Sequence, residues 1–241
     1  VNEPEFETTD FSTVRLIVWS GAAAPAALIE RLRFKCPDVA SAYGMTETVG
    51  SVTFTFDSDD LGILADSIGW PVPDYRVRIA GADGQAVPTG EPGEIQVRSD
   101  YLTAGYWRRP EATAALFTPD GWLRTGDLAA ERPDGAYRLI GRLTEMFKSG
   151  GYNVYPREIE LVLERHPDVA MAAVVGIPDP LYQEVGHAFV MVRPGRAVEA
   201  SALERHCRAE LANYKVPKRF TIAAELPTLP IGKIDKQALK K

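Results

Sequence analysis

A strand, a turn, a helix and a second strand follow one another near the start of the chain, and this order constrains the fold more than any other feature. Val14–Trp19 is a strand-like apolar run, Pro25 opens a segment with helical spacing, and Val39–Tyr43 is a second short strand. The order predicts a piece of a parallel α/β sheet. Parallel sheets are buried on both faces and one such unit cannot cover itself, so we expect further strands and helices upstream.

The middle of the chain has a different rhythm. Apolar residues alternate with polar ones in Tyr75–Ile79 and again in Glu94–Arg98, and the turn residues Gly81–Gly84 lie between the two runs. Alternation with a period of two, broken by such turn residues, indicates antiparallel strands. We therefore expect a small antiparallel β-barrel or meander after the parallel α/β piece.

The last hundred residues predict a compact α+β unit. Pro156 opens a helix, Val169–Val175 and Gly186–Val192 are strands, and Ser201–Glu204 has the pattern of a capping box, in which Ser and Glu satisfy free N–H groups at a helix start. We expect residues 1–141 and residues 142–241 to form separate domains.

Composition and charge exclude several classes of protein. The 241 residues carry 27 Lys+Arg against 33 Asp+Glu, a net charge of −6, which disfavours a nucleic-acid partner. No apolar run approaches the roughly 20 residues of a membrane helix, and the first residues lack the basic and apolar regions of a signal peptide. Two cysteines and three histidines give neither a disulfide framework nor a metal cluster. We expect a cytoplasmic enzyme or binding domain.

The segment Tyr43–Glu47 ends the second parallel strand, and ligands of open α/β sheets bind at the carboxyl ends of strands. Its aromatic ring, glycine, hydroxyl and carboxylate suit a purine, a phosphate and Mg²⁺, which proteins bind through one or two carboxylates plus substrate phosphates. An edge loop with a chance glutamate is the alternative.

Three later segments carry further candidate chemistry. Asp127 in Arg124–Leu128 has a carboxylate suited to a ribose diol, although turn aspartates often make only a local hydrogen bond. The paired glycines of Phe147–Val154 offer backbone to a phosphate or pantetheine, or form an ordinary hairpin. Lys233, beside a glycine in Pro230–Lys236, would by itself be a solvated surface charge.

Taken together in this order, the segments resemble the AMP-forming acyl/aryl-CoA synthetases of the adenylate-forming superfamily, which includes luciferase and peptide-synthetase adenylation domains. The matching segments span nearly the whole chain: Ser20–Ala23, Tyr43–Glu47, Gly93–Arg109, Arg124–Leu128, Gly141–Glu158 and Pro230–Lys233. The sequence of Lys148–Pro156 is similar to that of free-standing CoA ligases.

The chain lacks two parts of the family pattern and differs from it at a third position. The Ser/Thr/Gly-rich phosphate loop and the N-terminal subdomain, which precede the matching region in the family, are absent from this sequence. We therefore expect the C-terminal portion of such an enzyme, the end of the large domain plus the small lid domain, inactive alone. The hinge position, commonly Asp or Lys in the family, is Thr144 here.

The resemblance implies a two-step reaction with ATP, Mg²⁺ and coenzyme A, in which a fatty or aromatic carboxylic acid becomes acyl-AMP and then a thioester. Lys233 would stabilise the first transition state, Thr46 would bind phosphate, and Glu47 would hold Mg²⁺. Asp127 would accept the ribose hydroxyls. The remaining implied nucleotide- or CoA-binding residues are Gly21, Ala22, Ala23, Tyr43, Gly44, Met45, Arg142, Lys148, Ser149, Gly150 and Gly151.

Two other functions remain open. The chain could be a non-catalytic nucleotide-binding or interaction fragment, because the phosphate loop is missing. It could also belong to a ligase that passes the acyl group to a carrier protein instead of CoA. The apolar side chains of Val14, Leu16, Val18 and Leu28 are expected to form an exposed face through which the chain associates.

Overall fold

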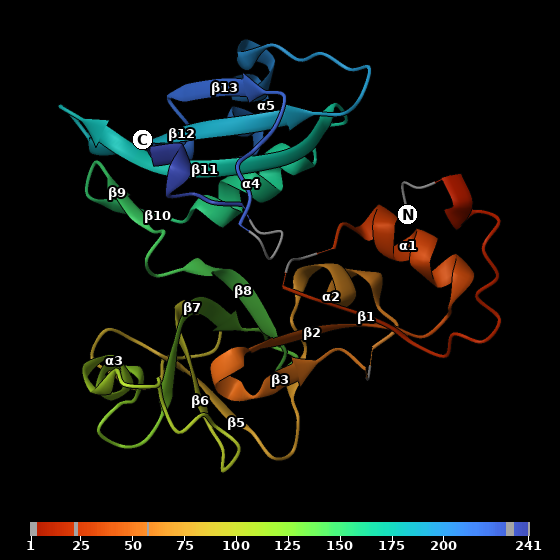
Figure 1. Ribbon diagram of the computed structural model, residues 1–241. Helices are drawn as coiled ribbons and strands as arrows, with labels where there is room; N and C mark the ends of the chain where they lie inside the picture. Colours follow the sequence, from red (N-terminus) through yellow and green to blue (C-terminus); the bar gives the residue numbers. More distant parts are fainter. Residues whose placement is uncertain (1–3, 22–23, 57, 230–233, 241) are drawn as a thin grey trace. The chain divides into compact units, whose positions relative to one another are not determined.

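A computed structural model describes residues 4–21, 24–56, 58–229 and 234–240 (Figure 1). The chain divides into two compact units, Val1–Leu139 and Ile140–Lys241, and each has its own hydrophobic core. The architecture is mixed α/β and α+β, as the sequence predicts.

The first sheet of the first unit has four strands in the order β1-β2-β3-β4. These strands are β1 (Ile17–Ser20), β2 (Val39–Met45), β3 (Gly50–Phe54) and β4 (Trp70–Pro71). Strands β1 and β2 are parallel, whereas β3 is antiparallel to both of its neighbours. The helices α1 (Ala26–Lys35) and α2 (Leu61–Asp66) contribute Ile29 and Leu64 to a small core with β1 and β2.

Strand β1 starts later than the sequence predicts. Val14–Leu16 lie outside it, and the first paired residue is Ile17, whose N–H donates to the carbonyl of Asp38 at 3.0 Å. The pairing with β2 begins at Val39, directly after Pro37 and Asp38, and proline has no N–H to donate to a sheet. The apolar run is therefore longer than the strand that it contains.

The alternating segments form the second sheet of this unit, in the order β5-β6-β7-β8. Its strands are β5 (Arg76–Ala80), β6 (Gly93–Arg98), β7 (Leu123–Glu131) and β8 (Tyr137–Arg142), and α3 (Pro110–Leu116) lies between β6 and β7. The β5–β6 and β6–β7 pairs are antiparallel, as expected. Buried Ile95 and Val97 of this sheet pack with Tyr43 and Val52 of the first, so that the two sheets share one core.

The second unit is built on one five-stranded sheet. It contains β9 (Phe147–Ser149), β10 (Tyr152–Val154), β11 (Val169–Asp179), β12 (Gln183–Val192) and β13 (Arg219–Ala223). The strand order is β10-β9-β12-β11, and β13 pairs with β12 in parallel. The helices α4 (Pro156–Glu164) and α5 (Ala200–Glu210) pack on the sheet.

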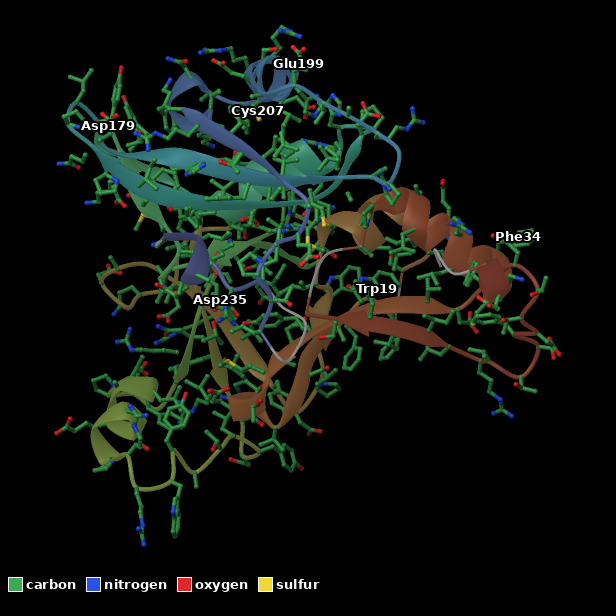
Figure 2. All side chains as sticks on the ribbon, turned by 45° about the horizontal axis from the view of Figure 1, so that its top comes forward. Trp19, Phe34, Asp179, Glu199, Cys207 and Asp235 are labelled. Carbon is green, nitrogen blue, oxygen red and sulfur yellow. The ribbon has the colours of Figure 1, made fainter. Side chains whose placement is uncertain are left out.

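Apolar residues at helical spacing on α4 and α5 form part of the core of the second unit. Ile159, Val162 and Leu163 of α4 meet Leu203 and Cys207 of α5, and all five side chains are buried. Cys207 lies inside this unit (Figure 2), and its burial raises the pKa of the thiol to about 12. Cys36 of the first unit is buried too, and both cysteines are free.

The expected capping box at Ser201–Glu204 is wrong. Helix α5 begins at Ala200 with Glu199 as its N-cap, and no side chain caps it. The Ser201 hydroxyl donates to the Glu199 carboxylate at 3.2 Å, whereas Glu204 pairs with Arg208 at 2.7 Å. Because Ala200 readily adopts helical backbone, the helix starts before the serine.

Three apolar residues near β1 are exposed: Val14, Leu16 and Val18 are 38%, 42% and 42% accessible. Leu28, which was expected to share this exposed face, instead packs against the small core of α1 and α2. Within the described residues, no helix has both the length and the apolar character needed to cross a membrane.

We expect Leu203→Ala to destabilise the second unit by about 2–5 kcal/mol, because the truncation leaves a cavity in a fully buried core. Urea denaturation followed by circular dichroism measures the loss. Leu181→Ala is the control, since Leu181 is exposed and its truncation should change stability by less than about 0.5 kcal/mol. Equal effects of the two substitutions would contradict this account of the core.

Candidate functional site

The first set of candidate residues lies at one edge of the first sheet. Strands β1 and β2 run in parallel with Ser20 opposite Ala42, so Gly21, which follows β1, and the end of β2 lie toward the same edge of the sheet. Tyr43–Met45 are the last residues of β2, and Thr46 and Glu47 follow it. Carboxyl ends of neighbouring parallel strands form the usual ligand-binding edge of such a sheet. Gly21 and the end of β2 therefore lie at the same edge of the first sheet.

Tyr43 and Asp127 are joined by a hydrogen bond. The Tyr43 hydroxyl donates to Asp127 Oδ2 at 2.9 Å, and the two residues are only 8% and 5% exposed. Burying a carboxylate is costly unless it is hydrogen-bonded, so this bond fixes the side chain that was predicted to accept the ribose hydroxyls. The predicted adenine and ribose residues thus lie in direct contact.

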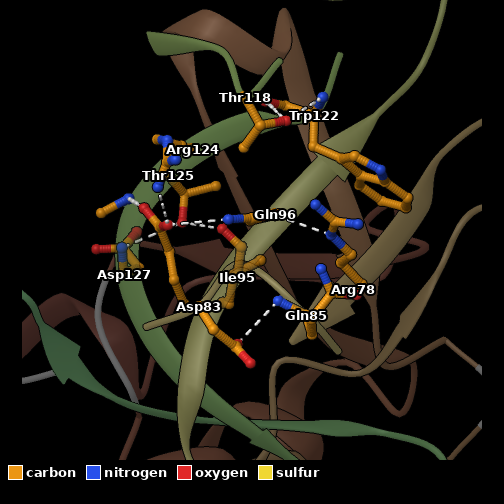
Figure 3. A network of polar contacts seen from close by, with 12 residues as sticks. Arg78, Asp83, Gln85, Ile95, Gln96, Thr118, Trp122, Arg124, Thr125 and Asp127 are labelled. Atoms are coloured by element: carbon orange, nitrogen blue, oxygen red, sulfur yellow. Dashed lines mark hydrogen bonds and ion pairs between the residues drawn. The ribbon is translucent and has the colours of Figure 1, made fainter. Parts of the chain in front are cut away.

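The part of strand β7 that carries Asp127 is held by a polar network (Figure 3). The Thr125 hydroxyl donates to the Ile95 carbonyl at 2.8 Å and accepts from the Asp127 N–H at 3.1 Å. Glu94 Oε1 accepts from the Gly126 N–H at 3.1 Å, and Glu94 also pairs with Arg124. These contacts set the backbone around Asp127 at a point where the β6–β7 register shifts.

The network continues along β6 and β5. Gln96, which is buried, donates to Glu94 at 3.1 Å and accepts from Arg78 Nε at 2.8 Å. The Arg78 guanidinium lies over the Trp122 ring at 4.4 Å (Figure 3). The same guanidinium pairs with Asp120. Sequence analysis gave Glu94 and Gln96 no role in the site, although both lie in Gly93–Arg109, one of the segments that resemble the family.

Glycine is required at position 44, near the end of β2. A Cβ added at Gly44 would lie 2.1 Å from the Gly50 carbonyl oxygen. The Thr48 hydroxyl bonds to Met45 and Gly50, and these bonds close the short 3₁₀ turn Thr46–Thr48. The turn leaves Thr46 exposed and Glu47 half-buried at the edge of the sheet.

Tyr106 contacts Glu47, and the sequence analysis gave this tyrosine no role. Its hydroxyl donates to Glu47 Oε1 at 2.6 Å, and the Thr103 N–H donates to the Glu47 carbonyl at 2.9 Å. The hydrogen bond to the Glu47 carboxylate raises the pKa of Tyr106, because that bond is lost when the phenol ionises. The segment Gly93–Arg109 supplied the only sequence signal, as one of the stretches that resemble the family.

The residues at this edge fit a magnesium ion that is shared with a bound phosphate. Within the described residues, no group of three or more His, Cys, Asp and Glu side chains is placed to hold a metal. Glu47 supplies one carboxylate and Thr46 an exposed hydroxyl. Mg²⁺ prefers such oxygen ligands and takes its remaining ligands from phosphates and water.

The second set of candidate residues lies in the second unit. Lys148 and Ser149 end β9, and Gly150-Gly151 form a two-residue turn to β10 with φ of +58° and +86°. Positive φ at both positions is what the favoured hairpin turn demands, and glycine adopts it without strain. Lys148 is exposed and Ser149 is 3% exposed, while Arg142 is exposed at the end of β8.

Three predicted site residues lie outside the described residues: Ala22, Ala23 and Lys233. Their roles stay predictions. Lys236, three residues after Lys233 in the sequence, forms ion pairs with Glu145 and Glu160 of the second unit. Sequence analysis identified none of these three contact residues.

Two protein families match this chain in succession. The family described as AMP-binding enzyme matches residues 1–107, and the family described as AMP-binding enzyme C-terminal domain matches residues 158–233. The two matches follow the chain in the order of its two units.

Individual relatives agree with these matches. A feruloyl-CoA synthase from Amycolatopsis sp is 39% identical over 99% of this chain and 48% of its own length. The amide bond synthetase McbA from Marinactinospora thermotolerans has a TM-score of 0.90 at 35% identity, over 99% of this chain and 49% of that chain. An o-succinylbenzoate coenzyme A synthetase from Bacillus subtilis, in complex with AMP, has a TM-score of 0.86 at 34% identity, over 98% of this chain and 48% of that chain. The chain spans about half the length of the curated relatives it matches.

We expect Glu47→Gln to lower the pKa of Tyr106 toward its ordinary value near 10.0, because the charged acceptor that favours the neutral phenol is removed. A pH titration of phenolate absorbance, with Tyr106→Phe subtracted to assign the signal, measures the change. Glu111→Gln neutralises another carboxylate nearby in the sequence and should leave this titration unmoved. An unchanged pKa in Glu47→Gln would show that the contact does not control Tyr106.

Proposed function

Because the chain belongs to the family of AMP-binding enzymes, we propose that it works as part of a longer carboxylate–CoA ligase that forms AMP. The proposed reaction activates a fatty or aromatic carboxylic acid with ATP and transfers the acyl group to CoA. The feruloyl-CoA and o-succinylbenzoate coenzyme A synthetases support this acceptor by their names.

The contact between Tyr43 and Asp127 is the observation that carries the nucleotide part of the proposal. It places an aromatic ring beside a buried carboxylate at the carboxyl edge of a parallel strand pair. The ring would stack on adenine, with the backbone of Gly21 nearby, and the carboxylate would accept both ribose hydroxyls. Charge-assisted bonds of this kind are stronger than neutral ones.

In the proposed first step, a carboxylate oxygen of the substrate attacks the α-phosphorus of ATP. A new oxygen–phosphorus bond forms, the bond to the β-phosphate bridging oxygen breaks, and pyrophosphate leaves. Thr46 would bind a phosphate oxygen and Lys233 would stabilise the charge that grows on the α-phosphate. Preorganised donors of this type stabilise a transition state because they need not reorient during the reaction.

Glu47 is the residue that would hold Mg²⁺, in the orientation set by its hydrogen bond with Tyr106. When bound, the ion neutralises part of the triphosphate charge. An ordinary phenol is already protonated at neutral pH, and the hydrogen bond to Glu47 raises the pKa of Tyr106 further, so the hydroxyl is a donor to Glu47.

In the proposed second step, the CoA sulfur attacks the acyl carbonyl carbon and AMP leaves with the electron pair of the broken acyl–oxygen bond. Lys148, Ser149 and the Gly150-Gly151 turn would line the approach of the pantetheine, and Arg142 would assist nucleotide binding. The two steps would use different orientations of the lid unit, reached by rotation at Thr144. Domains commonly move relative to one another by rotation about a few hinge residues, and such a rotation can bring different residues to the same site.

The acceptor is the least constrained part of the proposal. The similarity to an amide bond synthetase at 35% identity favours an amine as a second candidate acceptor in place of CoA. Transfer to the phosphopantetheine of a carrier protein and a purely nucleotide-binding role are the remaining alternatives. We further propose a cytoplasmic location and association through the exposed side chains of Val14, Leu16 and Val18.

One experiment tests the function directly. The longer protein is incubated with ATP, Mg²⁺ and a panel of fatty and aromatic acids, and pyrophosphate release is measured with CoA, a small amine or a carrier protein as acceptor. Acid-dependent pyrophosphate release followed by acyl-CoA formation is the expected result. Product formation only with the amine or the carrier protein would replace CoA as the acceptor, and no acid-dependent release would refute the ligase proposal.

In the longer protein, we expect Lys233→Ala to lower acyl-AMP formation by about 10²–10³, because one preorganised charged donor is lost. Thioester formation from supplied acyl-AMP and CoA should be largely unchanged. Lys218→Ala removes an exposed lysine of the same unit and serves as the control. A parallel fall of both half-reactions in Lys233→Ala would show that Lys233 does not act in the first step alone.

In the 241-residue chain, we expect Asp127→Asn to raise the Kd for AMP by about 10- to 100-fold, because hydrogen bonds to a charged acceptor are weakened. Isothermal titration calorimetry gives the two constants. Asp100→Asn neutralises an exposed aspartate and should bind AMP as the unsubstituted chain does. Equal AMP affinity in Asp127→Asn would remove Asp127 from the nucleotide site.

A further inference from the structure

Lys236 links three parts of the second unit. Its ammonium group pairs with Glu160 of α4 at 2.7 Å and also with Glu145, which follows β8. Its side chain is 17% exposed, and the Glu160 side chain is 4% exposed. A charge pair in such surroundings is weakly screened by solvent, so its geometry is strongly enforced.

The carboxylate of Glu160, which pairs with this lysine, is also held by other contacts. One of its oxygens accepts from the Val174 N–H of β11 at 3.0 Å, and the carboxylate also lies 3.5 Å from Arg157. The Val174 N–H therefore holds the Glu160 carboxylate on the sheet independently of the ion pair with Lys236. Removing the lysine would leave a buried charge with weaker compensation, which is unfavourable.

The segment that carries Lys236 is tied down by its own backbone as well. Thr228 and Ile234 form an antiparallel bridge, and the Asp235 N–H donates to the Pro227 carbonyl at 2.8 Å. The Asp235 carboxylate accepts from the N–H groups of Gln237 and Ala238 at 3.0 and 3.1 Å. These contacts fix the chain on both sides of residues 230–233 (Figure 2 labels Asp235).

We propose that Lys236 is a positioning residue that holds residues 234–240 on the body of the second unit, and that acyl-AMP formation in the longer protein depends on this anchor. The proposal rests on the proposed function in one respect, namely acyl-AMP formation by the longer protein. Lys236 itself has its charge engaged by two carboxylates and acts through the backbone that it anchors.

The Glu145 contact adds a second consequence. Glu145 directly follows Thr144, the position at which the lid unit is proposed to rotate, and its N–H donates to the Arg142 carbonyl at 3.1 Å. A backbone change at Thr144 would move the Glu145 carboxylate and so strain or release its pair with Lys236. The same lysine would then couple the hinge to residues 234–240.

Hydrogen exchange of the 241-residue chain tests the anchor without any enzyme activity. We expect Lys236→Met to speed exchange of the Asp235 and Ala238 amides at least about tenfold, while the Ala188 and Val190 amides of β12 keep their protection. Lys236→Arg should restore slow exchange because it keeps the charge. Lys240→Met is the matched control, an exposed lysine of the same segment, and should exchange normally.

Glu145→Gln provides a second variant in case Lys236→Met does not fold, since Glu145 lies at the surface end of the contact. This substitution should speed hydrogen exchange of the Asp235 and Ala238 amides less than Lys236→Met does. Unchanged exchange in both variants would overturn the anchor, and so would equal acceleration across β11 and β12, which would indicate a general loss of stability.

The positioning role is then measured in the longer protein. We expect Lys236→Met to lower the kcat of acyl-AMP formation at least about tenfold with the KM for ATP changed less than about twofold, and Lys236→Arg to recover it. Normal acyl-AMP formation despite a loosened segment would overturn the positioning role. Normal acyl-AMP formation in Lys233→Ala would instead refute the proposed function of Lys233, and the exchange result would still decide the anchor.

Discussion

The hydrogen bond between the Tyr43 hydroxyl and the Asp127 carboxylate is the contact on which the candidate nucleotide site depends. It joins β2 of one sheet to β7 of the other, above a core that the two sheets share. A buried carboxylate must be hydrogen-bonded, so this contact sets the approach of the two sheets as well as the direction of the aspartate. The same pair of side chains therefore serves the packing of the two sheets and the proposed binding of the nucleotide.

Carboxylates repeatedly fix the backbone or the side chains of residues that are distant in the sequence. Glu94 accepts from the Gly126 N–H of β7 just before Asp127, and Glu47 accepts from the Tyr106 hydroxyl. Glu160 accepts a backbone N–H of β11 and pairs with the ammonium group of Lys236. Each of these three carboxylates contacts a residue that is distant from it in the sequence. A polar network in which every group has a hydrogen-bond partner favours one arrangement of the chain, because other arrangements would leave polar groups unpaired.

Sequence patterns predicted what depends on local periodicity. The parallel strand pair, the antiparallel strands, the helix after Pro156 and the turn at Gly150-Gly151 follow from spacing and from glycine chemistry. The contacts Tyr43–Asp127 and Tyr106–Glu47 join residues 84 and 59 positions apart, which no periodicity reports. The capping box failed because a pattern of four residues does not determine where helical backbone begins. Tertiary contacts decide such boundaries.

Both cysteines of the chain, Cys36 and Cys207, are buried, and the Cys207 thiol has a pKa of about 12. Thiolates are the species that react with maleimides, so the native chain should resist labelling at neutral pH. A cysteine introduced at an exposed position of either unit would then take a dye or spin label selectively. Pairs of such labels, one on each unit, would allow distances between the units to be followed in solution while substrates are added, with no need to replace a native residue first.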